Sequence, residues 1–358
     1  MPITYEFCHK LPKCELHAHL NGSIRISTLN ELVEIAIKNN PNASGVEIIQ
    51  DTERTLDECF RIFDIIYKVV VRADTITRIM KETLEDFAKD NVAYCEIRTT
   101  PRRDIGAGPN EYIQAAIKGM IQYEKEARKN NTTKNPSIVT KSRLLLSISR
   151  TASLEDAMET VELAKKYFRY GDNNNKNNKK DINRVVGIEV SGNPKLGNFS
   201  TYLPALKKAR TYGIPISVHT GEVYKPMEVT DILNFQPDRL GHGLHLEPVH
   251  MKKLLFEKQI PIEICPTSNT MNLELNDLSE HPKLGIWLKN NYPISFNTDD
   301  SVLFNTTLTN EYYNVAKTFN LNEFEIEQLC RNVWDQIFDV NVKHEMMMKN
   351  NNNNISRY

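Results

Sequence analysis

Eight short runs of apolar, mostly β-branched residues recur along the chain, and most of the segments between them have the spacing of amphipathic helices. Helical spacing is clearest in Leu154–Tyr167 and Thr201–Tyr212. Strands that alternate with helices favour a parallel sheet covered by helices, and eight units favour its closure into a TIM-type (β/α)8 barrel. The runs are Cys14–Leu16, Ala93–Ile97, Arg143–Ile148, Arg184–Val190, Pro215–Val218, Arg239–Leu240, Pro261–Cys265 and Pro293–Asn297.

The gap between the first and second runs is longer than the others and spans residues 22–92. Its apolar spacing predicts about three amphipathic helices, including Leu56–Val71 and Ile76–Lys89. We interpret it as a helical insertion after the first strand, in a position suited to a lid. The run Leu308–Val342 is also predicted to be helical and to pack on the outside.

The chain of 358 residues suits one large barrel with insertions. We predict a single (β/α)8 metal-dependent hydrolase domain over residues 1–345 and an Asn-rich, disordered tail over residues 346–358. Residues 130–135 and 172–180 are also Asn-rich. We predict loop insertions there, because such segments have little apolar surface to bury.

The charge balance excludes some classes of partner. The net charge is -1 and no basic stripe is visible, which argues against a nucleic-acid-binding protein. No apolar run approaches the roughly 20 residues of a membrane span, and the N-terminus lacks the pattern of a signal peptide. The six cysteines form no C-x-x-C pair. We therefore expect a cytoplasmic monomer with reduced, mostly buried thiols and no membrane partner.

Side chains that can bind a metal occur at the ends of three predicted strands. His17 and His19 are two residues apart, so both imidazoles face the same way from a strand. His219 ends the fifth strand and Asp299 follows the eighth. Three imidazoles and one carboxylate suit Zn²⁺ with an open position for water. We predict one zinc ion per chain, bound by these four residues.

Two further residues suit hydrolysis at such a site. His242, in a G-H-G turn after the sixth strand, would hold or deprotonate a water, and Glu222, three residues after His219, would deliver a proton to a ring nitrogen beside the attacked carbon. Zinc would lower the pKa of the water to about 7. Each motif alone also occurs in turns, but four such signals at the ends of buried strands favour a hydrolytic metal site.

Five motifs resemble, in order and spacing, those of the adenosine deaminase family of the amidohydrolase superfamily: LPKCELHAHLNGS, HTGE, DRLGHG, ICPTSN and FNTDD. The resemblance runs from Leu11 to about Tyr312. It implies a (β/α)8 barrel with one zinc ion that hydrolyses the 6-amino group of adenine nucleosides or bases. It also implies that Glu222 protonates N1 and His242 orients the hydroxide. A purine contact from Gly192 and Asp300 is implied by the resemblance alone.

Finer motifs resemble the adenosine deaminase-like branch, whose members are N6-methyl-AMP deaminases that release methylamine and form IMP. This chain has His19-Leu20-Asn21-Gly22 at the position where nucleoside-specific members have a motif similar to HLDG. The runs RTTPRR at 98–103, SGNP at 191–194 and FDII at 63–66 fit the same branch. The residues expected to contact substrate are His19, Asn21, Tyr67, Thr99, Thr100, Pro101, Arg102, Ser149, Gly192 and Asp300.

Electrostatics favours a nucleotide at this site. A carboxylate at position 21 would repel a 5′-phosphate, whereas the Asn21 amide can donate a hydrogen bond to it. Thr99 and Thr100 offer hydroxyl donors, and Arg102 or Arg103 can pair with phosphate, although both arginines also suit a solvated basic loop.

At two positions the chain differs from the branch it resembles, which has His at position 67 and tends to have Asp at position 149. Tyr67 suits either one hydrogen bond to phosphate or packing in the core, and Ser149 would need a bridging water. The alternatives to the nucleotide deaminase are an adenosine or adenine deaminase and, in another class, a catalytically silent purine-binding barrel protein.

Overall fold

The computed structural model describes residues 3–40, 45–49, 55–131, 138–168 and 183–346. The Asn-rich segment 172–180, most of segment 130–135 and nearly all of the tail 346–358 lie outside these ranges. The single domain over residues 1–345 and the disordered tail stay predictions.

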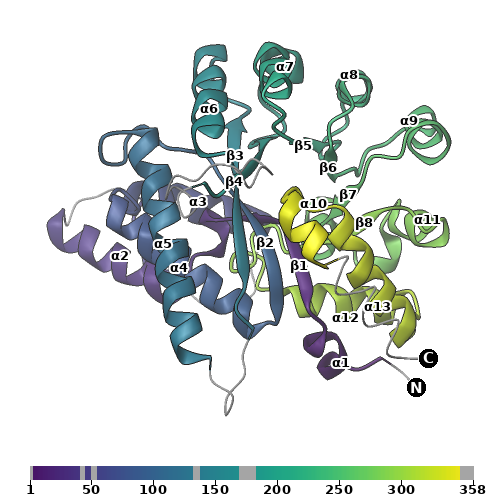
Figure 1. The fold of residues 1–358 in the computed structure, drawn as a ribbon, viewed down its shortest axis with the longest axis horizontal. Coiled ribbons are helices and arrows are strands. Elements are labelled where there is room, and N and C mark those ends of the chain that lie inside the picture. The colour runs from purple at the N-terminus through teal and green to yellow at the C-terminus, as the bar shows by residue number, and fades with distance from the viewer. Residues whose placement is uncertain (1–2, 41–44, 50–54, 132–137, 169–182, 347–358) are drawn as a thin grey trace. The chain divides into compact units, whose positions relative to one another are not determined.

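All eight predicted strands are present, and they form one parallel sheet in chain order (Figure 1). The sheet is a nearly closed, TIM-type barrel, as predicted. The strands are β1 (Lys13–His19), β2 (Val92–Thr99), β3 (Lys141–Ser149), β4 (Val185–Ser191), β5 (Ile216–Thr220), β6 (Arg239–His242), β7 (Ile262–Ile264) and β8 (Ile294–Phe296).

Helices follow the strands, and the predicted insertion after β1 is helical. It contains α2 (Ile26–Asn39), α3 (Leu56–Val69) and α4 (Ala73–Lys89), preceded by a 3-10 turn at Asn21–Ser23. The remaining helices are α1 (Tyr5–Lys10), α5 (Pro109–Asn130), α6 (Leu154–Tyr167), α7 (Leu203–Thr211), α8 (Pro226–Phe235), α9 (Pro248–Lys252), α10 (Pro266–Asn272), α11 (Leu284–Lys289), α12 (Leu308–Thr318) and α13 (Glu323–Asn332).

The chain divides into two compact units. The first comprises residues 1–142, 264–285 and 296–326. Its helix α3 begins with a capping box, in which the Thr55 hydroxyl accepts from the Glu58 N–H at 3.3 Å and the Glu58 carboxylate accepts from the Thr55 N–H at 2.7 Å. The second unit comprises residues 143–263, 286–295 and 327–358.

The core of the second unit contains a buried ion pair between neighbouring strands. Arg239 of β6 donates from Nε to Glu263 of β7 at 2.7 Å, and the Ser217 hydroxyl of β5 donates to the same carboxylate at 3.0 Å. The Arg239 guanidinium also lies 3.6 Å from the ring centre of Phe338. Buried charges of this kind persist in a core only when they are paired and hydrogen-bonded.

Within the first unit, strand β1 pairs with the segment that follows β8. Ala18 forms a parallel bridge with Asp299, and the His19 N–H donates to the Asp299 carbonyl at 2.9 Å. Two residues before Ala18 on the same strand, the Leu16 N–H donates to the Asn297 side chain at 2.9 Å. These contacts join the end of the last strand to the first strand.

The buried carboxylate of Glu15 strengthens this junction. One oxygen accepts from the His17 N–H at 2.8 Å, and the other accepts from the N–H and hydroxyl of Thr298 at 2.9 and 2.8 Å. Burial raises the pKa of Glu15 to about 7, although these hydrogen bonds and the nearby Arg98 favour the ionised form. The side chain thus links β1 to the turn after β8.

Gly22 permits a close approach between two segments of the first unit. A Cβ atom at position 22 would lie 1.8 Å from Oδ1 of Asp300. The Gly22 carbonyl also accepts from the Val302 N–H at 3.0 Å. No side chain larger than hydrogen fits here unless Asp300 moves.

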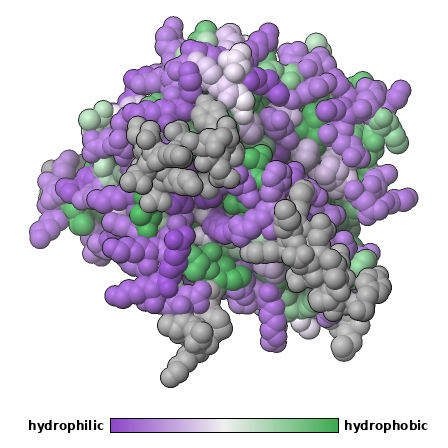
Figure 2. Space-filling view, viewed as in Figure 1, coloured by the Kyte–Doolittle hydropathy of each residue, from purple (hydrophilic) through white to green (hydrophobic). Residues whose placement is uncertain are grey.

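The visible face of the molecule is mostly hydrophilic, with small separate hydrophobic areas (Figure 2). Among the described residues, no helix is long and apolar enough to span a membrane. All six cysteines are buried and none of them forms a disulfide, as expected. The monomeric state and the cytoplasmic location stay predictions.

The substitution Gly22→Ala is expected to lower the free energy of unfolding by about 1–3 kcal/mol, because the added methyl group overlaps Asp300. Urea denaturation measures the change. The matched control is Gly285→Ala in the same unit, where the added Cβ would be 3.4 Å from Phe319 and the helical site favours alanine. Equal midpoints for Gly22→Ala and the unmodified protein would contradict the close approach.

Candidate metal centre

Strand β1 and the turn after β8 place three predicted ligands together in the first unit. Nε2 of His17 lies 3.6 Å from Oδ1 of Asp299, and Nε2 of His19 lies 3.4 Å from the same oxygen. The two imidazole rings have centres 5.5 Å apart and are inclined by 75°. Two-residue alternation along β1 therefore directs both rings toward one carboxylate oxygen.

The other carboxylate oxygen of Asp299 is held by Ser268 of α10. The Ser268 hydroxyl donates to Oδ2 of Asp299 at 2.7 Å, and it accepts from the Asn272 side-chain amide at 3.3 Å. The amide donor leaves the Ser268 hydroxyl hydrogen directed at Asp299. Oδ2 is thus occupied by a hydrogen bond, while Oδ1 faces the imidazoles.

The fourth predicted ligand, His219, lies on β5 in the second unit and has a carboxylate neighbour. Its Nδ1 is 3.5 Å from Oε2 of the fully buried Glu189 on β4. Glu189 also accepts hydrogen bonds from the hydroxyls of Ser147 and Ser191. A carboxylate beside Nδ1 favours the tautomer that leaves Nε2 as the ligand atom.

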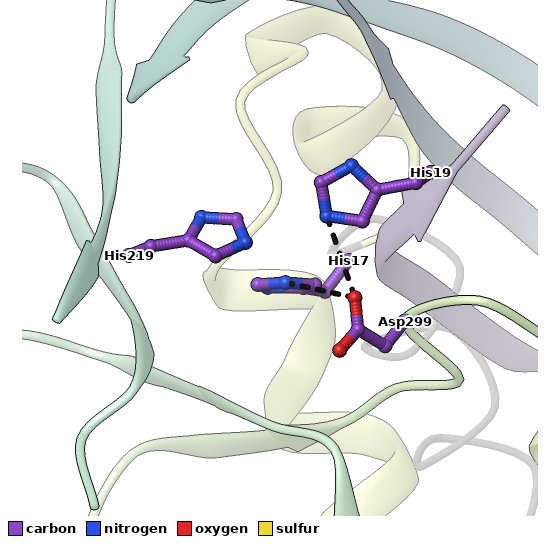
Figure 3. Close-up of side chains that lie close together, drawn as sticks. All are labelled: His17, His19, His219 and Asp299. Atoms are coloured by element: carbon purple, nitrogen blue, oxygen red, sulfur yellow. Dashed lines mark ion pairs between the residues drawn. The ribbon is translucent and has the colours of Figure 1, made fainter. Parts of the chain in front are cut away.

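The structure brings the four predicted ligands together. One ligand atom from each of His17, His19, His219 and Asp299 lies within 4.8 Å of the others (Figure 3). Zinc with Zn–N bonds of about 2.1 Å in tetrahedral geometry separates its ligands by roughly 3.4 Å. The two His–Asp distances, 3.6 and 3.4 Å, agree with that separation. This donor set fits a metal site.

A second grouping of possible ligands shares two of these residues. It consists of His17, His242, Cys265 and Asp299, all buried, with ligand atoms within 4.8 Å of one another. His242 and Cys265 therefore lie close enough to influence a metal or its water. The first grouping is the one predicted from the sequence.

The two predicted acid–base residues are neighbours in the second unit. Nε2 of His242 lies 3.9 Å from Oε1 of Glu222, and the rings of His242 and His219 have centres 5.0 Å apart. Glu222 follows Gly221, whose φ of +67° turns the chain sharply after β5. The acid–base roles of both residues stay predictions.

Two site residues have left-handed backbone conformations. The φ angles are +62° for His242 and +60° for Asp299. Such conformations cost about 1–3 kcal/mol for a residue with a side chain and are common at functional sites. His242 is the last residue of β6, and Asp299 lies three residues after the end of β8.

Two of the predicted substrate residues of the first unit are neighbours: the Asn21 side chain lies beside the Tyr67 hydroxyl. Burial raises the pKa of Tyr67, while the Arg102 charge and the Asn21 side chain act in the opposite direction.

Arg102 makes most of its hydrogen bonds within the protein. Its guanidinium donates to the carbonyls of Tyr67 and Val70 at 3.0 and 2.8 Å, forms two bonds to Asp104, and lies 5.0 Å from the centre of the Tyr67 ring. Four of its five N–H groups are therefore used. Arg102 joins the end of α3 to the loop after β2, and its contact with phosphate stays a prediction.

The other predicted substrate residues lie at strand ends. The Thr99 hydroxyl, at the end of β2, hydrogen-bonds the buried Tyr112 hydroxyl at 2.6 Å, and Thr100 and Pro101 follow as half-buried residues.

Two more of these residues are neighbours in the second unit. Ser149 ends β3, and a Cβ built on Gly192 would lie 3.4 Å from its hydroxyl oxygen. Gly192 has a φ of +104°, a conformation that favours glycine.

Sequence reasoning missed the residues that support the ligands. Glu15 and Glu189 are acidic residues inside apolar strands, so each offered a signal of a buried functional carboxylate. Ser268 belongs to the recognised ICPTSN motif, but nothing in its local pattern indicates a bond to Asp299, which is 31 positions away.

Comparison with known proteins agrees with this geometry. The family model described as "Adenosine deaminase" matches residues 12–349. The N6-mAMP deaminase of Arabidopsis thaliana is 37% identical over 349 residues, covering 93% of this chain and 94% of the relative. The N6-Methyl-AMP deaminase of Mus musculus is 32% identical, covering 94% and 90%. The crystal structure of Arabidopsis ADAL complexed with IMP is 36% identical with a TM-score of 0.83, covering 96% of this chain and 97% of that chain. The chain therefore belongs to the adenosine deaminase family.

Proposed function

We propose that the protein is a zinc-dependent hydrolase that converts N6-methyl-AMP and water to IMP and methylamine. The group His17, His19, His219 and Asp299, in which all but His19 are buried, is the observation that carries the hydrolytic proposal. The substrate follows from Asn21 and from the similarity to relatives named N6-methyl-AMP deaminases. Similar crystal structures are described as complexes of Arabidopsis ADAL with IMP and with GMP.

The four ligands fit one zinc ion, with Asp299 using Oδ1 because Ser268 holds Oδ2. A zinc ion bound there would lower the pKa of a water to about 7 and so supply a nucleophile at neutral pH. Glu189 would keep His219 in the tautomer that ligates through Nε2.

Glu222 and His242 would perform the proton transfers. The Glu222 carboxyl donates a proton to N1 of the purine, which makes C6 more electrophilic. His242, 3.9 Å from Glu222, orients the attacking water by a hydrogen bond. Water adds to C6, one of its protons restores the Glu222 carboxyl and the other goes to the departing nitrogen, so that the C6–N bond breaks and methylamine leaves. The ring keeps the oxygen as the 6-oxo group of IMP.

Asn21 and Tyr67 would bind the 5′-phosphate. The two side chains lie beside each other, and both the Asn21 amide and the Tyr67 hydroxyl carry hydrogens that could be donated to phosphate. The Thr100 hydroxyl and the remaining N–H of Arg102 would add donors. Gly192 and Asp300 would contact the purine, with Asp300 held beside Gly22.

A substrate panel tests the proposal. Zinc-loaded protein is expected to release methylamine from N6-methyl-AMP with a higher kcat/KM than it releases ammonia from AMP, adenosine or adenine. The measurement follows both amines and the purine product, with N6-methyladenosine as the matched substrate without phosphate. A higher kcat/KM on adenosine than on N6-methyl-AMP would indicate an adenosine deaminase. No turnover of any of these substrates would indicate a silent purine-binding barrel.

The substitution Asn21→Asp tests the phosphate contact. The new carboxylate would repel phosphate and has no N–H to donate to it. We expect KM for N6-methyl-AMP to rise about 10- to 100-fold, which corresponds to about 1.4–2.8 kcal/mol of binding free energy. KM for N6-methyladenosine should change little. Equal losses on both substrates would show that Asn21 does not face the phosphate.

The substitution Glu222→Gln tests the proton donor. The amide has almost the same shape but no acidic proton for N1, so kcat should fall by about 10²- to 10⁴-fold. Zinc content, measured by elemental analysis, should stay near that of the unmodified protein because Glu222 is not a ligand. His17→Ala is the contrasting control, since it removes a ligand and should lower the zinc content. Retention of most activity by Glu222→Gln would mean that another group protonates the ring.

A further inference from the structure

Glu311, on the first turn of α12, is a fully buried carboxylate that takes no part in the proposed reaction. Its Oε2 accepts from the Thr267 N–H at 3.1 Å, and its Oε1 accepts from the Thr306 hydroxyl at 2.6 Å. Thr267 belongs to a different helix, α10, and Thr306 lies in the segment that precedes α12. The carboxylate therefore joins separate segments of the first unit.

Both partners belong to segments that shape the metal centre. Thr267 is in the first turn of α10 and directly precedes Ser268, which donates to Oδ2 of Asp299. Thr306 ends the segment 299–306, which begins with Asp299 itself, and its N–H donates to the Ser301 carbonyl at 2.9 Å. Glu311 therefore holds both the ligand-bearing segment and the helix that orients the ligand.

We propose that Glu311 is a positioning residue of the metal centre, which fixes α10 against the segment 299–306 so that Ser268 keeps Oδ1 of Asp299 directed toward the metal. The inference rests on the metal site of the proposed function, but not on the identity of the substrate. The measurable consequence is that the unmodified protein loses zinc more slowly than a variant in which the Glu311 contacts are removed.

The contacts explain why a carboxylate is needed. Two donors, an N–H and an O–H, point at the side chain from different segments, and only a carboxylate accepts from both at once. Glutamine could accept from the Thr267 N–H only by turning its NH₂ group toward Thr306, whose hydroxyl would then lose its short bond to residue 311 and be left to donate to the more distant Thr307 carbonyl at 3.4 Å. Helix α10 has only seven residues, too few to be stable alone, so its position depends on such contacts.

Burial raises the pKa of Glu311 to about 7 in spite of both hydrogen bonds. A buried acid of this kind is a poor choice for stability alone, because an apolar residue of similar size packs without the loss of hydration. Retention of the acid at this position is consistent with a role in placing Ser268 and Asp299.

Asp90 offers a matched control within the same unit. It is a buried carboxylate that accepts from the N–H of Thr309 at 3.0 Å and also from the Thr309 hydroxyl. Thr309 lies in the first turn of α12, as Glu311 does. Asp90→Asn therefore weakens the anchoring of the same helix turn through bonds that go to Thr309 rather than to α10 or to the segment 299–306.

The experiment compares zinc loss from the zinc-loaded unmodified protein, Glu311→Gln, Thr306→Val and Asp90→Asn. Each protein is mixed with excess chelator, and the rate of zinc transfer and the melting temperature are measured. We expect Glu311→Gln to lose zinc about tenfold faster, at the lower end of the 10- to 100-fold effect of residues behind metal ligands. Thr306→Val should show a smaller increase, and Asp90→Asn should lose zinc at the unmodified rate even where its melting temperature falls.

Equal rates of zinc loss for Glu311→Gln and Asp90→Asn, with similar melting temperatures, would overturn the proposal and leave Glu311 a purely structural residue. Should Glu311→Gln fail to fold, Thr306→Val decides: a rate equal to that of the unmodified protein overturns the proposal. Failure of the unmodified protein to bind zinc would overturn the proposed function as well, and is distinguished by metal analysis before chelator is added.

Discussion

The hydrogen bonds of one buried carboxylate, Glu15, join the beginning of the barrel to its end. Glu15 accepts from the backbone of His17 and from Thr298, a residue 283 positions later. Because Thr298 directly precedes Asp299, the contact that closes the sheet also sets a carboxylate beside the two imidazoles of β1. The ligand geometry is thus a consequence of barrel closure rather than of local sequence, and burial of the junction excludes the water that would otherwise compete for these polar groups.

Backbone strain accompanies this placement. Asp299 and His242 both have positive φ angles, and each is held by neighbouring strands. The Asp299 carbonyl accepts from the His19 N–H at 2.9 Å, and after His242 the Gly243 N–H donates to the Thr220 carbonyl at 2.9 Å. Regular strand pairing on one side of each residue offsets the cost of the left-handed turn. The side chains are then set before any ligand arrives, which is the condition under which electrostatic stabilisation is most effective.

Local patterns predicted the strands and the helical insertion, and they singled out the four residues of the possible metal site, because these features depend on short-range periodicity and on residue types at strand ends. The apolar run 185–190 and the His-x-His alternation at 17–19 are examples. The residues that hold the candidate ligands in place, such as Glu15 and Glu311, could not be predicted in the same way. The partner of Glu15 lies across the whole chain, and that of Glu311 lies 44 positions away. Arg102 was predicted to pair with phosphate from its charge alone, whereas most of its donors are used by backbone carbonyls of α3 and by Asp104.

The metal ligands and the predicted phosphate contacts come from different kinds of element. His17, His19 and His219 lie on strands whose neighbours restrain them on both sides. Asn21 and Tyr67 instead lie in the segment between β1 and β2, where a single arginine fastens α3 to the following loop. Substitutions in that segment can therefore alter which substrate is bound without disturbing the ligand geometry. Tyr67, at a position where the resembled branch has histidine, lies in that segment beside Asn21, and its phenol, like an imidazole, carries a hydrogen that it can donate.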